Sequence, residues 1–264
     1  MTDHPFAERI DINGVNVAFR RKGSGPPLLF INGMGLTRRW LNVFDALADR
    51  FDVITPDNPG FGDTPRPAWY RTLDDLLPHH ADFLTALDVE QAHIVGHSLG
   101  GLIAGAFAAT YPERVASLTL LAPMAMPVVS PSELQGGHEG PPPDDIMAML
   151  FNDNQAAYPE YDSPADLGLL VAAADDDLAD PAAWKLDVAP GLYRRLSRIT
   201  APSQVVVPDE DRTIPKSVFD TWSRWLGDAP LVRISGQRHP TGHLLLVQEP
   251  QAVADQIAAL ALAC

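Results

Sequence analysis

The stretch that decides the fold is "AHIVGHSLGGLIAGAFAATY", residues 92–111. A short apolar run at 92–97 leads directly into a longer run of small and apolar residues, so the pattern indicates a buried strand followed by a helix. Ser98 lies at the junction, between Gly96 and Gly100. Glycines lack a Cβ and let strand and helix approach closely, which lifts the serine hydroxyl out of the sheet. A nucleophilic serine is therefore favoured over a structural serine in a tight turn.

Strand and helix signals alternate on both sides of this junction. "ERIDI" and "VNVAFR" flank the turn pair Asn13-Gly14 and predict a hairpin. Thr37 is expected to cap a helix that carries Trp40 and Phe44. Further strands are predicted for "PPLLFI", "FDVITPD", "VASLTLLAP", "SQVVVPD" and "PLVRIS", and further helices for 73–87, 217–226 and 250–264. This alternation predicts an α/β fold, with a mostly parallel, doubly wound sheet covered by helices on both faces.

The alternation breaks down between Met124 and Arg198. Prolines, glycines and acidic runs such as "GGHEGPPPDD" and "AADDDLADP" separate short helical pieces there. The segment holds 13 acidic and 4 basic residues, so it carries −9 of the net charge of −15. We interpret 124–198 as an inserted helical cap, and 1–123 with 199–264 as the core domain.

Composition excludes several classes of function. A net charge of −15 opposes binding to nucleic acid or to an anionic membrane, because both need clustered Lys and Arg. Cys264 is the only cysteine, so neither a disulfide framework nor a Cys-based metal site is expected. No secretory leader and no apolar run of membrane-spanning length is found, which favours a cytoplasmic protein. We expect a small-molecule substrate as the partner, no metal and no cofactor, and leave a homodimer open.

A serine nucleophile needs a base and an acid that orients the base. Of the eight histidines, most fall in polar loops or structural positions, and the neighbours His79 and His80 are expected on a helix surface. The segment "SGQRHPTGHLLLVQEP", residues 235–250, follows the last predicted strand and offers His239 and His243. Their spacing could suggest a metal pair, but no helix or nearby third ligand is predicted. For the acid, "VVVPDEDRTIP", residues 205–215, offers three adjacent carboxylates.

Taken together, these motifs resemble the α/β-hydrolase fold family over nearly the whole chain outside the cap. In that family the base lies in a Gly-His pair shortly before a helix start such as Glu-x-Pro, which implies His243, with His239 as a loop neighbour. The family's acid turn, Gly-x-x-Asp-x-x-x-Pro, is similar to "PDEDRTIP" with Pro208 in place of glycine. The resemblance thus implies Asp211 as the acid. Asp209 and Glu210 are then expected at the turn surface, with Asp209 as the alternative acid.

The resemblance also implies an oxyanion hole. One donor is the backbone N–H of Leu99, directly after the nucleophile. The other is Met34 in "FINGMG", which resembles the family's His-Gly-x-Gly loop. Asn32 stands where the family usually has histidine, so the hydrogen bonds of this loop are expected to differ. Asn32 and Gly33 are predicted to contact the substrate.

Met124 and Met126 directly follow the strand "VASLTLLAP", at the sheet edge where open α/β sheets bind ligands, and are predicted substrate contacts. The acidic cap and its methionines favour a small, largely apolar and neutral substrate. We expect a serine hydrolase that cleaves a carboxylic ester, thioester or lactone through an acyl-enzyme on Ser98. A C–C bond hydrolase or a cofactor-free peroxidase of the same fold is the alternative, and a catalytically silent ligand-binding protein is the alternative from another class.

Overall fold

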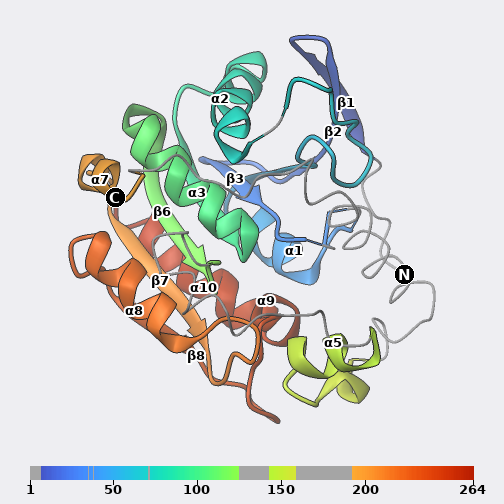
Figure 1. Cartoon of the computed structure of the whole chain (residues 1–264), viewed down its shortest axis with the longest axis vertical. Helices are drawn as coiled ribbons and strands as arrows, with labels where there is room; N and C mark the ends of the chain where they lie inside the picture. The colour runs from blue at the N-terminus through green and yellow to red at the C-terminus, as the bar shows by residue number, and fades with distance from the viewer. Residues whose placement is uncertain (1–6, 35, 38, 71, 125–142, 159–191) are drawn as a thin grey trace.

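The computed structural model describes residues 7–34, 36–37, 39–70, 72–124, 143–158 and 192–264. Its strands form one eight-stranded sheet in the order β1-β2-β4-β3-β5-β6-β7-β8 (Figure 1). The strands are β1 (Glu8–Ile12), β2 (Val15–Lys22), β3 (Pro27–Ile31), β4 (Asp52–Pro56), β5 (Ala92–His97), β6 (Val115–Leu121), β7 (Ser203–Pro208) and β8 (Leu231–Ile234). β2 runs antiparallel to β1 and β4, and the other neighbours are parallel. The mostly parallel, doubly wound sheet predicted from the sequence is confirmed.

Helices cover both faces of the sheet. They are α1 (Asn42–Ala48), α2 (Leu76–Ala86), α3 (Leu99–Thr110), α5 (Pro143–Leu150), α7 (Leu192–Arg195), α8 (Lys216–Trp225), α9 (Leu245–Gln248) and α10 (Pro250–Ala261), with 3-10 turns at Leu73–Asp75, Pro112–Arg114, Gln155–Ala157 and Leu196–Arg198. α2 and α3 pack together over one face, and α1 and α10 pack together over the other (Figure 1). None of the helices in the described ranges is long and apolar enough to cross a membrane.

The β1–β2 hairpin forms as predicted. Asn13 and Gly14 both have positive φ, 54° and 84°, which is the backbone that a two-residue type I′ turn requires. The helix start predicted at Thr37 is wrong, because α1 begins only at Asn42 after Leu41. Thr37 is instead buried in the preceding loop, where its carbonyl accepts a hydrogen bond of 3.0 Å from the Arg20 guanidinium.

The core contains two histidines that were expected on the surface. His79 and His80 of α2 are 2% and 0% exposed. The Tyr70 hydroxyl lies 3.0 Å from Nδ1 of His79, whereas neither ring nitrogen of His80 has a hydrogen-bond partner within the described ranges. His80 lies four residues after Leu76 and four before Leu84, so helical spacing places it on the face that packs against the core.

The predicted cap, 124–198, is described only in part. Residues 143–158 contain α5 and one 3-10 turn, and α5 lies near α9 in Figure 1. The first cap boundary adjoins residues outside the described ranges, and Met126 lies among them, whereas the second boundary lies at the end of the described 3-10 turn Leu196–Arg198. The division into domains stays a prediction.

Candidate active site

Ser98 occupies a strained turn between β5 and α3. Its φ and ψ are 54° and −119°, a conformation that residues with a Cβ rarely adopt. A Cβ on Gly96 would overlap the Gly100 carbonyl, and a Cβ on Gly100 would overlap the Ile31 carbonyl oxygen. The two glycines are therefore required for β5, β3 and α3 to meet at the serine.

Three residues from distant parts of the chain meet at this turn. The Ser98 hydroxyl lies 2.9 Å from Nε2 of His243, and Nδ1 of the same ring lies 2.8 Å from Oδ2 of Asp211. Oδ1 of Asp211 accepts the backbone N–H groups of Thr213 and Ile214, both at 2.8 Å. The side chains of His243 and Asp211 are 4% and 2% exposed. The arrangement is a buried chain of hydrogen bonds from hydroxyl to imidazole to carboxylate.

The Asp211 carboxylate sets the tautomer of the imidazole. Burial raises the pKa of Asp211, but the charge of His243 and three N–H donors together hold this pKa below its usual range. An ionised carboxylate only accepts hydrogen bonds, so Nδ1 of His243 carries a proton and Nε2 has a free lone pair. Ser98 therefore donates its hydroxyl proton toward His243, which is the geometry of general-base activation.

His97 holds the backbone of His243. Its Nε2 donates a hydrogen bond of 3.0 Å to the His243 carbonyl oxygen, and the ring centroids are 5.0 Å apart. Burial, together with the nearby His243, lowers the pKa of His97 to about 3, so this ring is neutral at physiological pH. His97 directly precedes Ser98 in the sequence, but no sequence signal predicts this contact, because it joins residues far apart in the chain.

The loop that carries His243 is also bonded to α5 and α9. Gly242 donates its N–H to Oε1 of Gln248 at 2.7 Å, and Nε2 of Gln248 donates to the Phe151 carbonyl at 3.3 Å. Leu244 donates its N–H to the Leu150 carbonyl at 3.1 Å. The backbone on both sides of His243 is thus tied to the end of α5.

The loop after β3 lies against the serine. A Cβ on Gly33 would lie only 2.9 Å from the Ser98 Cβ. Within the described ranges, the backbone N–H groups of Met34 and Leu99 donate no hydrogen bond, which leaves both available to a substrate oxygen. The Asn32 amide is 1% exposed, and neither its oxygen nor its nitrogen has a partner in the described part of the chain. The sequence predicts unusual hydrogen bonds in this loop, because Asn32 stands where the family that it resembles usually has histidine.

Met124 is fixed beside the nucleophile at the end of β6. Its backbone N–H donates to the Ser98 carbonyl at 2.9 Å, and its carbonyl accepts a hydrogen bond of 3.0 Å from the Trp222 indole of α8. The sequence does not single out Trp222. Its indole ring packs against Gly105 of α3, where a Cβ would lie 2.5 Å from the ring. Met126 lies outside the described residues.

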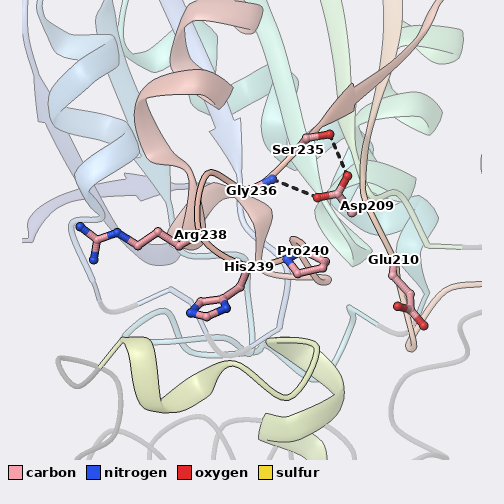
Figure 2. Close-up of a pocket in the computed structure, with 7 residues that line it drawn as sticks. All are labelled: Asp209, Glu210, Ser235, Gly236, Arg238, His239 and Pro240. Atoms are coloured by element: carbon pink, nitrogen blue, oxygen red, sulfur yellow. Dashed lines mark hydrogen bonds between the residues drawn. The ribbon is translucent and has the colours of Figure 1, made fainter.

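The other members of the acidic cluster differ from each other. Glu210 is exposed, whereas Asp209 is half-buried and hydrogen-bonded to Ser235 and Gly236, so its assignment to turn surface is wrong (Figure 2). The exposed His239 lines an open depression of about 500 Å³ next to them (Figure 2). Among the described residues, no group of three or more His, Cys, Asp or Glu side chains is arranged to hold a metal ion.

Comparison with known proteins identifies the family. A family model described as alpha/beta hydrolase fold matches residues 26–174, more than half of the 264 residues. The chain belongs to the α/β-hydrolase fold family. The match includes the serine turn and the loop after β3, and the strand order and helix layers agree with it.

Several relatives of this α/β-hydrolase-fold chain carry esterase or hydrolase names. A pimeloyl-(acyl-carrier protein) methyl ester esterase of Aeromonas hydrophila subsp. hydrophila is 38% identical over 41% of the chain and 42% of its own length. A 2-(acetamidomethylene)succinate hydrolase of Mesorhizobium japonicum is 27% identical over 90% of both chains. The crystal structure of a membrane phospholipase A is similar with a TM-score of 0.80 and 26% identity, over 96% of this chain and 84% of the other. The chain spans only 31–33% of the length of the first curated relatives it matches.

Proposed function

We propose that the protein is a serine hydrolase that cleaves a carboxylic ester, thioester or lactone of a small, largely apolar substrate. The observation that carries the proposal is the buried line of hydrogen bonds from Ser98 through His243 to Asp211, at 2.9 and 2.8 Å. The strained backbone at Ser98 adds support, because such strain is concentrated at functional sites.

The proposed reaction begins with attack of the Ser98 oxygen on the acyl carbon. The hydroxyl proton passes to Nε2 of His243, and Asp211 stabilises the resulting imidazolium through Nδ1. The N–H groups of Met34 and Leu99 bind the negative oxygen of the tetrahedral intermediate. Nε2 then gives its proton to the leaving alkoxide or thiolate as the bond to the acyl carbon breaks.

Water completes the cycle in the second half of the reaction. His243, neutral again, takes a proton from a water molecule that attacks the acyl-enzyme. The second tetrahedral intermediate collapses as Nε2 returns the proton to the Ser98 oxygen. This releases the carboxylic acid and regenerates the hydroxyl, so protons and electrons balance over the two halves.

The preference for an apolar, neutral substrate rests on the surroundings of the serine. Met34 and Met124 are half-buried and pack against the core beside it. The segment 124–198 carries a net charge of −9, which opposes the approach of an anion. A neutral aryl ester should therefore be hydrolysed faster than its carboxylate-bearing analogue, and a preference for the anion would refute this part of the proposal.

A fluorophosphonate probe tests the activity itself, because it reacts with activated serines. The intact protein should be labelled, and the Ser98→Ala and His243→Ala variants should not. Absence of labelling in the intact protein would instead support a catalytically silent ligand-binding protein. A panel of acyl esters, thioesters, lactones and a vinylogous diketone then distinguishes acyl hydrolysis from C–C bond cleavage, with ester, thioester or lactone turnover as the expected result.

A further inference from the structure

The Asp209 side chain closes the loop that leads from β8 to His243. Its Oδ1 accepts the Ser235 hydroxyl at 2.8 Å, and its Oδ2 accepts the Gly236 N–H at 2.9 Å (Figure 2). The same Oδ2 accepts the Thr241 N–H at 3.1 Å. One carboxylate thus binds the first two residues of the loop and a residue near its end.

Thr241 joins Asp209, directly after β7, to the end of β8. It is fully buried, and its hydroxyl accepts the Asp209 N–H at 2.9 Å while donating to the Ile234 carbonyl at 2.6 Å. Its own carbonyl accepts the Glu210 N–H at 3.1 Å. Asp209 and Thr241 are therefore joined by reciprocal side-chain and backbone bonds, which fix one loop against the other.

The position of this pair in the sequence relates it to the candidate active site. Asp209 lies two residues before Asp211, and Thr241 lies two residues before His243. The hydrogen bonds between Asp209 and Thr241 thus set the distance between two short segments, one ending at Asp211 and the other at His243. A shift of about 1 Å in such a separation can lower a rate by about 100-fold, although it leaves substrate contacts elsewhere intact.

We propose that Asp209 is a positioning residue that holds the His243 loop in register with Asp211. The proposal rests on the proposed hydrolase function, because it assigns Asp209 a role in the same reaction. Asp209 does not touch the reacting atoms and acts only through the loop.

The negative charge of the Asp209 carboxylate favours the three hydrogen bonds that it accepts. Partial burial raises the pKa of its carboxyl, but the Gly236 N–H, the Ser235 hydroxyl, the Thr241 N–H and the nearby Arg233 together lower this pKa below the usual range. An asparagine can reproduce most of the arrangement, since its oxygen can accept both N–H groups while its NH₂ donates to the Ser235 hydroxyl. An alanine removes all three bonds at once.

These differences define a matched set of variants. Asp209→Ala should lower kcat by about 10- to 100-fold with KM changed by less than about threefold, because chemistry rather than binding depends on the alignment. Asp209→Asn should restore kcat to within about fivefold of the parent protein. Glu210→Ala is the control, since it removes the same charge from the exposed neighbour, and should stay within about twofold. Equal rates for Asp209→Ala and Glu210→Ala would overturn the proposal.

The proton between Asp211 and His243 gives a readout that needs no substrate. Its low-field proton NMR resonance should be present in the parent protein, Asp209→Asn and Glu210→Ala, and broadened or lost in Asp209→Ala. An unchanged resonance in Asp209→Ala would overturn the positioning role even if the protein were less stable. If the resonance responds as expected but no variant, nor the parent, reacts with a fluorophosphonate, the proposed function fails while the link between Asp209 and His243 stands.

A second variant tests the same link if Asp209→Ala does not fold. Thr241→Val keeps the shape of the side chain but removes the hydroxyl that joins the Asp209 N–H to the Ile234 carbonyl. It should lower kcat and broaden the resonance in the same direction as Asp209→Ala. A Thr241→Val protein with the parent's kcat and resonance would overturn the proposal.

Discussion

Asp211 uses both carboxylate oxygens, one for the backbone of Thr213 and Ile214 and the other for His243. In Asp211→Asn the amide oxygen can still accept the two N–H groups, which turns the NH₂ group toward Nδ1 of His243. Nδ1 must then accept, so the proton moves to Nε2 and the ring can no longer take a proton from Ser98. We expect kcat to fall by about 10³- to 10⁴-fold with the fold intact, measured by ester hydrolysis and circular dichroism.

The neighbouring acids provide the controls for this prediction. Asp209→Asn and Glu210→Gln each remove one negative charge close to Asp211, but neither alters the tautomer of His243. Both should retain kcat within about fivefold. If Asp209→Asn were the most damaging of the three, the assignment of the acid to Asp211 would be wrong.

His80 gives a pH dependence of stability. Its complete burial, and secondarily the neighbouring His79, lower the pKa of His80 to about 3, against 6.5 in the unfolded chain. Between these values the unfolded chain binds more protons, so this contribution to stability is present above pH 6.5 and is lost as pH falls toward 3. His80→Leu should raise the free energy of unfolding, and reduce its loss between pH 7 and pH 5 by about 1–2 kcal/mol, measured by urea unfolding.

An exposed histidine serves as the control for His80. His239→Leu removes an imidazole from an exposed loop position, and should change the free energy of unfolding at pH 7 by less than about 0.5 kcal/mol. Identical pH profiles for His80→Leu and the parent protein would show that His80 does not titrate on unfolding.

Residue patterns predict local chemistry better than they predict contacts between loops. Ser98 could be chosen because its glycine neighbours and its strand-to-helix context are all local, whereas His243 and Asp211 were implied by the resemblance to the α/β-hydrolase fold family. The hydrogen bonds of Asp209 could not be predicted, because its partners lie 26 to 32 residues away in a loop without regular structure. His80 was misplaced because its polarity was given more weight than its helical spacing.

At the scale of elements, α5 and α9 meet at the backbone beside His243. Gln248 joins them, and Gln248→Ala would leave the buried Gly242 N–H without its partner, whereas the Phe151 carbonyl would keep its hydrogen bond of 3.1 Å from the Asn154 N–H. We expect the free energy of unfolding to fall by about 1–3 kcal/mol, which is the cost of one buried polar group left without a hydrogen bond. Amide hydrogen exchange in residues 143–158 should become faster, and kcat should fall as the loop loosens.

Gln251 lies on the neighbouring helix α10 and offers the matched control. Its side chain is exposed and bonds only the exposed Asp255 among the contacts of the described chain. Gln251→Ala should change the free energy of unfolding by less than about 0.5 kcal/mol and leave exchange in 143–158 unaffected. Faster exchange in both variants to the same degree would contradict a specific role for Gln248.

The elements themselves were largely predictable, and their boundaries less so. The alternation of strand-like and helix-like segments identified the strands, and the Asn13-Gly14 turn identified the hairpin, because these signals are contiguous in sequence. Thr37 looked like a helix cap, but the Arg20 guanidinium binds its carbonyl and keeps this segment in the loop. A contact with Arg20 of β2, which is distant in sequence, thus outweighs the local capping signal.

At the scale of the whole molecule, the sheet order brings the candidate active site together. Ser98 follows β5, Asp211 follows β7 and His243 follows β8, and these parallel strands end at the same edge with β6 between the first two. This order places side chains 32 and 145 residues apart within hydrogen-bonding distance. The alternation of strands and helices predicts that the parallel strands end at one edge of the sheet, but it does not predict the order of the strands. The position of the site was therefore predictable and its geometry was not.

The net charge of −15 acts on any substrate that approaches this edge. Salt should therefore change kcat/KM according to substrate charge, because the Debye length falls from about 30 Å at 0.01 M to about 3 Å at 1 M. For a carboxylate-bearing aryl ester we expect a rise of about threefold or more over this range as repulsion is screened. The neutral ester should stay within about 1.5-fold and a trimethylammonium ester should slow down, both followed by stopped-flow absorbance. A carboxylate ester that slows with salt would instead reveal a cationic binding site, and the preference for neutral substrates would have to be abandoned.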